Sequence, residues 1–108
     1  MVKAIFPGSF DPPTYGHMNI IERGARLFDS LEVVIAVNSM KAPLLPPEEK
    51  KRLLEDEIGK MGLDGVKVTT HEGLVVEYCR KVGASVLLRG VRTSGDYDYE
   101  LELSILNK

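Results

Sequence analysis

The chain has 108 residues, with 14 lysines and arginines against 16 aspartates and glutamates, so its formal net charge is −2. Hydrophobic residues make up 44% and charged residues 28%, a composition typical of one small globular domain and not of a disordered chain. The near balance of charge gives no reason to expect nucleic acid or an anionic membrane as a partner. The single cysteine, Cys79, excludes an intramolecular disulfide and a cysteine-rich zinc site.

No stretch of the sequence is apolar for long enough to span a bilayer, and the apolar run before Pro7 is too short for a signal peptide. We therefore expect a cytoplasmic protein. Cys79 lies in an apolar helical stretch, which favours a small buried side chain over a nucleophile.

Short apolar runs alternate with longer amphipathic ones along the chain. The patterns predict strands over residues 2–6, 31–37, 66–70 and 85–88, and helices over residues 17–28, 48–61, 74–82 and 96–107. The run 31–37 is apolar at almost every position, as in a strand buried on both faces of a parallel sheet. Four strand–helix units in succession predict an α/β fold, a Rossmann-like, doubly wound parallel sheet that makes a single domain of residues 1–108.

The unusual residues of the sequence follow the predicted strands. They are the segment 8–17, the segment 38–43 with Lys41, the segment 71–75, and the group Arg89, Gly90 and Arg92. Because sheets of this type bind ligands at the carboxyl ends of their strands, we expect these residues to meet at one rim.

The first of these loops, residues 7–17, combines two glycines with a histidine that opens the following helix. Gly8 and Gly16 allow a ligand to approach the backbone closely, and free N–H groups at a helix start can hold an anion. His17 would then point at the same anion. The plainer interpretation is a proline-rich turn with a helix-capping histidine.

The string GSFDPPTYGH, residues 8–17, resembles the signature of the nucleotidyltransferase superfamily that carries (His/Thr)-x-Gly-His. Its threonine form, here Thr14, is the one found in bacterial phosphopantetheine adenylyltransferases. Ser9 stands where that family usually has threonine, and it keeps the hydroxyl.

Further segments resemble the same family. Lys41 matches its substrate-binding lysine, and residues 64–66 and 71–75 are similar to the segment that lines the pantetheine arm. Residues 89–100 resemble its Arg-Gly-x-Arg…Asp-Tyr-Glu block. The likeness covers nearly every residue of the chain.

The resemblance implies direct in-line transfer of the adenylyl group of ATP to 4′-phosphopantetheine, with dephospho-coenzyme A and pyrophosphate as products. It implies that His17 stabilises the transition state. Substrate contacts would come from Ser9, Lys41, Val75 and Arg89. Nucleotide contacts would come from Ser9, Phe10, His17, Gly90, Val91, Arg92 and Glu100.

Mg²⁺ is expected to be carried mainly by the ATP phosphates, and no protein ligand is assigned to it. Coenzyme A is expected as a product-like ligand, and a homo-oligomer is expected because family members are typically hexamers. Family members also continue beyond the point matched by Lys108, with a fifth strand–helix unit. We therefore expect a fragment, or a short protein with an incomplete nucleotide site that assembly stabilises.

Three alternative functions stay open. The chain could be a sibling nucleotidyltransferase that acts on another phosphate acceptor, or a truncated chain that binds pantetheine or nucleotide without turnover. A non-catalytic module such as a phosphoacceptor receiver is the third, although a receiver needs an acidic pair after its first strand, where this chain offers only Asp11, and an aspartate after its third. Single residues also have plainer interpretations: a surface salt bridge for Arg89, a turn cap for Asp11 and a surface position for His71.

Overall fold

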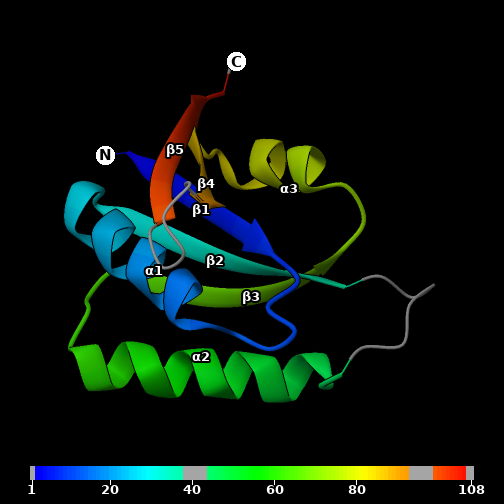
Figure 1. The fold of residues 1–108 in the computed structure, drawn as a ribbon. Coiled ribbons are helices and arrows are strands. Elements are labelled where there is room, and N and C mark those ends of the chain that lie inside the picture. Colours follow the sequence, from blue (N-terminus) through cyan, green and yellow to red (C-terminus); the bar gives the residue numbers. More distant parts are fainter. Residues whose placement is uncertain (1, 38–43, 93–98, 107–108) are drawn as a thin grey trace.

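The computed structural model describes residues 2–37, 44–92 and 99–106 of the chain. In chain order its elements are β1 (Lys3–Gly8), α1 (Tyr15–Leu27), β2 (Ser30–Val37), α2 (Pro47–Met61), β3 (Val66–Glu72), α3 (Val75–Val82), β4 (Val86–Arg92) and β5 (Tyr99–Ile105) (Figure 1). No helix in this part of the chain is long and apolar enough to cross a membrane.

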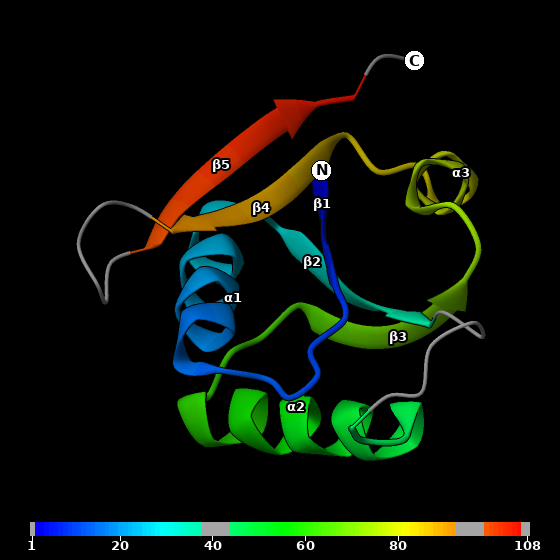
Figure 2. The ribbon, with the colours of Figure 1, turned by 45° about the vertical axis from the view of Figure 1, so that its right-hand side comes forward.

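The strands form one sheet in the order β3-β2-β1-β4-β5. The first four strands are parallel and β5 is antiparallel to β4. Helices α1 and α2 lie on one face of the sheet and α3 lies on the other (Figure 2). This arrangement confirms the predicted α/β, Rossmann-like fold with helices on both faces of a mostly parallel sheet.

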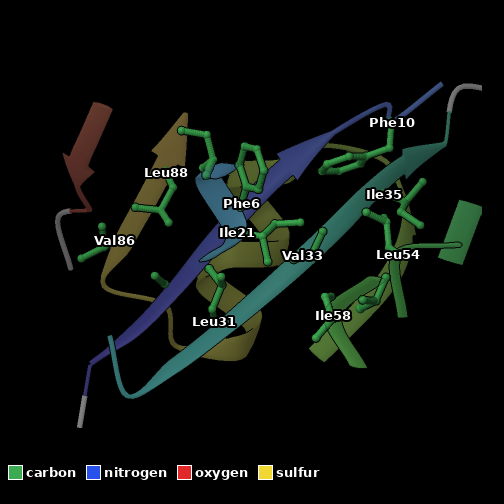
Figure 3. Packing of buried hydrophobic residues seen from close by; sticks show 13 residues of the cluster. Phe6, Phe10, Ile21, Leu31, Val33, Ile35, Leu54, Ile58, Val86 and Leu88 are labelled. Carbon is green, nitrogen blue, oxygen red and sulfur yellow. The ribbon is translucent and has the colours of Figure 1, made fainter. Parts of the chain in front are cut away.

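The larger part of the core lies between the sheet and the helices α1 and α2 (Figure 3). Alternate residues of a strand point to the same face, so β2 directs Leu31, Val33 and Ile35 towards these helices. Each of the three is fully buried. Helix α2 contributes Leu54 and Ile58, which are one turn apart on its buried stripe.

The opposite face carries a smaller cluster under α3. Ile5, Val34 and Cys79 form its centre, and Cys79 is 2% exposed, as predicted. Burial also raises the pKa of the Cys79 thiol, which keeps it protonated at neutral pH. The buried carboxylate of Glu32 lies on the same face and accepts a hydrogen bond from the Tyr78 hydroxyl, so α3 is fixed by a polar contact as well as by packing.

The strand β1 pairs unequally with its two neighbours. Its register with β2 runs over six residue pairs, from Lys3–Ser30 to Gly8–Ile35. Its register with β4 holds only two pairs, Ala4–Val86 and Ile5–Leu87. The strands β1 and β4 therefore part before their carboxyl ends, where Pro7 has no N–H to donate to a ladder.

The helix predicted over residues 96–107 is wrong for the described residues of that range. Residues 99–105 form β5, which pairs with β4 over seven residue pairs from Val86–Ile105 to Arg92–Tyr99. The hydrophobic residues Leu101, Leu103 and Ile105 alternate with polar ones, a period that suits a strand. The pairing also lengthens the fourth strand, so Arg89, Gly90 and Arg92 lie within β4 and not after it.

Candidate active site

A small pocket opens where β1 and β4 part. Strand order reverses at this point, because β2 and β3 lie on one side of β1 and β4 lies on the other. Such switch points are where open α/β sheets bind their ligands. The pocket has a volume of about 140 Å³ and is lined by Phe6, Pro7, Gly16, His17, Ile20, Arg89 and Gly90.

Two larger hollows among the described residues lie at the other ends of the strands. One, of about 410 Å³, includes Gly83, Ala84 and Ser85, which precede β4. The other, of about 440 Å³, lies between α2 and the start of β3. Both are at the amino ends of strands, whereas the pocket beside His17 is at the carboxyl ends. We therefore assign the site by its chemistry and topology and not by volume.

His17 is the third residue of α1 and closes a capping box with the N-cap residue Thr14. The Thr14 side chain accepts a hydrogen bond from the His17 backbone N–H over 3.3 Å. In return the Thr14 backbone N–H donates to His17 Nδ1 over 3.0 Å. A backbone N–H can only donate, so Nδ1 is an acceptor and the proton of the neutral ring is on Nε2.

The ring of His17 is half-buried between the first loop and the core. Its centroid lies 4.7 Å from that of Phe10 and 6.3 Å from that of Phe6. Burial lowers the pKa of the His17 imidazole below its ordinary value of 6.5. The ring is therefore neutral at pH 7, and its Nε2–H is a hydrogen-bond donor.

Phe10 anchors the loop that joins β1 to α1. Its side chain is 1% exposed and meets Phe6 edge to face, with ring centroids 5.5 Å apart. Its backbone has a φ of +49°, in the left-handed region that L-residues rarely adopt. A Cβ at Gly8 would lie 3.1 Å from the Phe10 ring, so this position accepts only glycine without a shift. The nucleotide contact of Phe10 stays a prediction, and the burial of the ring leaves only the backbone to make it.

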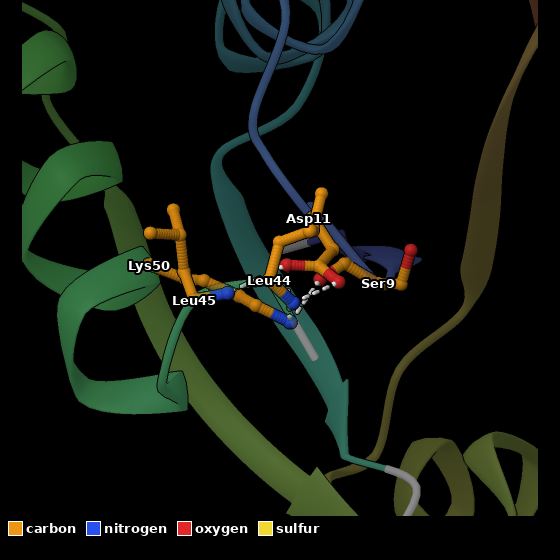
Figure 4. A network of polar contacts seen from close by, with 5 residues as sticks. All are labelled: Ser9, Asp11, Leu44, Leu45 and Lys50. Carbon is orange, nitrogen blue, oxygen red and sulfur yellow. Dashed lines mark hydrogen bonds and ion pairs between the residues drawn. The ribbon is translucent and has the colours of Figure 1, made fainter. Parts of the chain in front are cut away.

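The carboxylate of Asp11 joins the first loop to the segment before α2 (Figure 4). Its two oxygens accept hydrogen bonds from the backbone N–H groups of Leu44, over 2.8 Å, and Leu45, over 3.0 Å. Lys50 Nζ lies 3.6 Å from the same carboxylate and donates to the Ser9 carbonyl oxygen over 3.1 Å. Asp11 therefore does more than cap its own turn.

Arg89 reaches the pocket from β4 but already has an acidic partner. Its guanidinium donates to the Glu102 carboxylate of β5 over 2.7 Å, and both side chains are largely exposed. The plainer interpretation of Arg89, a surface salt bridge, is therefore what the structure contains. Arg89 is also one of the residues that line the pocket beside His17.

The other predicted site residues are spread more widely. Gly90 lines the pocket, and the adjacent Val91 pairs with Glu100 across β4 and β5, next to the pair of Arg92 with Tyr99. Val75 begins α3 and packs against the cluster on the opposite face of the sheet. Ser9 is exposed in the first loop. Lys41 lies outside the described residues.

Sequence reasoning missed Lys50, which is 4% exposed although it is a lysine. A signal was present, because Lys50, Leu54 and Ile58 follow one another at intervals of four on the buried face of α2. A lysine in such a stripe requires an acceptor on the neighbouring element.

The comparison with known families agrees with this geometry. The cytidylyltransferase-like family model matches residues 5–108. The chain belongs to that family.

Curated relatives in the family carry a narrower name, phosphopantetheine adenylyltransferase. The protein of that name from Bifidobacterium longum is 42% identical over 108 residues, which are 100% of this chain and 65% of that protein. The one from Caldanaerobacter subterraneus is 47% identical over 108 residues, 100% of this chain and 66% of that protein. The one from Geotalea daltonii is 45% identical over 105 residues, 97% of this chain and 64% of that protein. The chain thus spans slightly less than two thirds of the length of these three relatives.

A solved structure also resembles this member of the family. It comes from Vibrio parahaemolyticus and is provisionally described as a nicotinate-nucleotide adenylyltransferase. The TM-score is 0.52 at 31% identity, over 65% of this chain and 40% of that chain. The likeness supports the fold that the strand order gives.

Proposed function

We propose that the chain transfers the adenylyl group of ATP to 4′-phosphopantetheine, a step of coenzyme A biosynthesis that yields dephospho-coenzyme A and pyrophosphate. The relatives named phosphopantetheine adenylyltransferase support the substrates. The observation that carries the proposal is the setting of His17, a neutral imidazole with a fixed tautomer at the switch point of the sheet.

The reaction joins two anions, so the protein has to align them and offset their charge. A phosphate oxygen of the acceptor attacks the α-phosphorus of ATP, and the bond from that phosphorus to the oxygen of the leaving pyrophosphate breaks. No covalent intermediate with the protein is needed, so alignment and electrostatic stabilisation supply the acceleration. The parting of β1 and β4 gives this chain an opening in which the reacting phosphates can lie.

His17 Nε2–H would donate to a non-bridging oxygen of the α-phosphate as negative charge gathers there. The start of α1 adds the backbone N–H groups of Tyr15 and Gly16, which lack intrahelical acceptors at their positions in the first turn. Because the Thr14 backbone N–H holds Nδ1, the ring keeps the tautomer that donates from Nε2. A preset donor of this kind costs no reorganisation during the reaction.

Arg89 would bind the phosphate of the acceptor by exchanging its partner. An arginine holds phosphate and carboxylate with the same planar set of N–H donors. The pair with Glu102 is exposed to solvent, so it is weak enough for a substrate phosphate to displace the carboxylate. Ser9 and Lys41 are proposed as further contacts with this substrate, and Gly90, Val91, Arg92 and Glu100 as contacts with the nucleotide.

Mg²⁺ is proposed to enter with ATP, whose phosphates would supply most of its oxygen ligands. The residues of the first loop fit this arrangement. Their carboxylate, that of Asp11, is already engaged by the backbone N–H groups of Leu44 and Leu45 and by Lys50, so the ATP phosphates remain the main ligands of the ion. When bound, the ion would neutralise part of the phosphate charge.

Self-association is proposed to use the free edge of β5. Leu103 is 50% exposed and Ile105 is 84% exposed, and the described residues of this strand contain no proline or lysine to block pairing. An antiparallel pair with a second copy, centred on Leu103, sets Glu102 opposite Ser104 of that copy. A pair centred on Glu102 would oppose two carboxylates, which disfavours it.

The test is pyrophosphate release from Mg·ATP with 4′-phosphopantetheine as the acceptor. His17→Gln keeps an acceptor for the Thr14 N–H, because glutamine is a usual third residue of a capping box, but it removes the imidazole. We expect release that depends on the acceptor and falls about 100-fold or more in His17→Gln. Glu22→Gln, on the same helix and paired with the exposed Arg26, is the control and should match the wild type.

Equal rates for His17→Gln and the wild type would contradict the role given to His17. Release with nicotinate mononucleotide and not with 4′-phosphopantetheine would assign a sibling reaction. Calorimetric binding of 4′-phosphopantetheine without release would reduce the function to binding.

A further inference from the structure

Lys50 is a buried cation whose partners belong to the candidate site. Its side chain is 5% exposed and projects from α2 on the same face as Leu54 and Ile58. Burial of an ammonium group is costly unless the charge is paired and hydrogen-bonded. Both needs are met by the first loop: Nζ donates to the Ser9 carbonyl over 3.1 Å and lies 3.6 Å from the Asp11 carboxylate.

The two partners of Lys50 lie on either side of Phe10. Ser9 precedes it and Asp11 follows it, so one ammonium group holds the chain before and after the residue with a φ of +49°. Left-handed backbone in a residue other than glycine persists only when its surroundings fix it. The Phe10 ring supplies one constraint from inside the core (Figure 3), and Lys50 supplies the other from α2 (Figure 4).

The same carboxylate extends the constraint to the segment after β2. Asp11 accepts the backbone N–H groups of Leu44 and Leu45, which follow Lys41 by three and four positions. The loop that carries Ser9 and the segment that leads from Leu44 into α2 are therefore joined at one point, beside Lys50.

We propose that Lys50 is a positioning residue for adenylyl transfer: it holds the loop from Ser9 to Asp11 so that Ser9, His17 and the start of α1 keep the alignment that in-line attack requires. This inference rests on the proposed function. Lys50 does not line the pocket, and it acts through the Ser9 carbonyl and the Asp11 carboxylate.

A purely structural role would be to anchor α2, but Leu54 and Ile58 already bury the helix against the sheet. An apolar side chain at position 50 would anchor α2 without the desolvation penalty of a charge. The feature that only a cation with several donors provides is the simultaneous hold on a carbonyl and a carboxylate of the first loop.

The test compares Lys50→Met, which keeps the stem and removes the charge, with Lys50→Arg and with Lys60→Met. Lys60 is on the same helix, and its exposed pair with Glu57 lies away from the pocket. In Lys50→Met we expect kcat to fall about 10- to 100-fold, because a small misplacement of reacting groups has effects of this size. KM for ATP should change by less than about threefold. Lys50→Arg should recover most of kcat, and Lys60→Met should match the wild type.

A second measurement is independent of turnover. The ¹⁵N chemical shifts of the His17 ring report which nitrogen carries the proton. The wild type, Lys50→Arg and Lys60→Met should show the proton on Nε2, whereas Lys50→Met should show a mixture, since a displaced loop loosens the contact of Thr14 N–H with Nδ1. Asp11→Asn, which preserves side-chain size, replaces Lys50→Met in both measurements if the latter does not fold.

Folded Lys50→Met with the kcat and the His17 shifts of the wild type would overturn the inference. A wild-type chain that releases no pyrophosphate would overturn the proposed function instead. In that case the ¹⁵N chemical shifts of the His17 ring still decide whether Lys50 holds the loop from Ser9 to Asp11.

Discussion

Three hydrogen-bond contacts join His17 to Thr14, and one of them couples the protonation of the ring to the cap of α1. Thr14 donates its backbone N–H to His17 Nδ1 over 3.0 Å. A proton on Nδ1 would turn that acceptor into a donor, and the cap of α1 would lose one of its bonds. The cap of the helix and the tautomer of the proposed catalytic ring are therefore linked.

This link predicts a loss of stability in mild acid. The pKa of His17 is lowered by burial from its unfolded value near 6.5, so the unfolded chain binds the proton more readily than the folded one. The contribution of His17 to stability is present above 6.5 and is lost as pH falls from 6.5 through the lower folded pKa. Urea unfolding between about pH 5 and pH 8 should show this loss in the wild type and not in His17→Gln. Equal pH dependence in the two proteins would contradict the link.

Asp11 predicts a second loss at lower pH. The backbone N–H of Leu44 holds the pKa of the Asp11 carboxyl below its ordinary value of 3.8, and the Leu45 N–H and Lys50 add to this effect against a smaller opposing effect of desolvation. Its contribution to stability is present above 3.8 and is lost as pH falls through the lower folded pKa. Asp11→Asn should flatten the unfolding free energy between about pH 2 and pH 4 relative to the wild type. Asp56→Asn, which removes an exposed carboxylate from α2, is the matched control.

Glu102→Gln should strengthen the binding of a phosphate-bearing acceptor. The substitution releases Arg89 from its carboxylate partner, and exposed pairs of this kind are worth about 1 kcal/mol or less. We expect the affinity for 4′-phosphopantetheine to rise by up to about fivefold and stability to change by less than about 1 kcal/mol. Calorimetry at two salt concentrations measures the effect. Glu57→Gln, which breaks an exposed pair on α2, should leave the affinity unchanged, and a fall in affinity in Glu102→Gln would argue against phosphate binding by Arg89.

Gly24 should resist replacement by alanine although it lies inside α1. A Cβ there would come 2.8 Å from Leu88 Cδ1 and 3.3 Å from Leu31 Cδ2, and both leucines are fully buried. Overpacking costs about 1–3 kcal/mol, which outweighs the gain of about 1 kcal/mol in helix propensity. Gly59→Ala in α2 meets no atom within 4 Å and should be neutral or stabilising. Chemical denaturation of the two variants checks the difference in sign.

The free edge of β5 predicts self-association that a charge can abolish. Ile105→Lys places a cation on an exposed strand edge, where lysine discourages pairing. Sedimentation velocity over a range of concentrations should show a dimer or larger species for the wild type and a monomer for Ile105→Lys. A wild type that stays monomeric throughout that range would exclude this edge as an interface.

Most of the strands and helices could be predicted because their apolar residues recur with the period of only one type of element, helix or strand. The run 31–37 fits no amphipathic helix. Leu54, Ile58 and Met61 recur at intervals of four and three, which places them on one face of a helix but on both faces of a strand. Residues 99–105 are ambiguous, since Leu101 and Ile105 are four apart, a spacing that suits one face of a helix and also one face of a strand. Leu103 lies between them and favours the strand, and pairing with β4 decides the outcome.

The candidate site was predictable where it depends on the first loop and the helix that follows. The loop sequence and the helix start bring Gly16 and His17 to the carboxyl end of β1. The partner of Arg89 could not be predicted, because it depends on the strand position of Glu102. The partners of Lys50 depend on how α2 packs against the first loop, a tertiary relationship that periodicity does not encode.

The early parting of β1 and β4 also sets where along the sheet a ligand can enter. The last pair of this ladder joins Ile5 to Leu87, and β1 continues for three residues to Gly8, about 10 Å at the usual rise of a strand. Along that length β1 pairs with β2 and has no partner in β4 among the described residues. The place of the opening is therefore fixed by backbone pairing, so substitutions of the lining side chains can change what the pocket binds without moving it along the sheet.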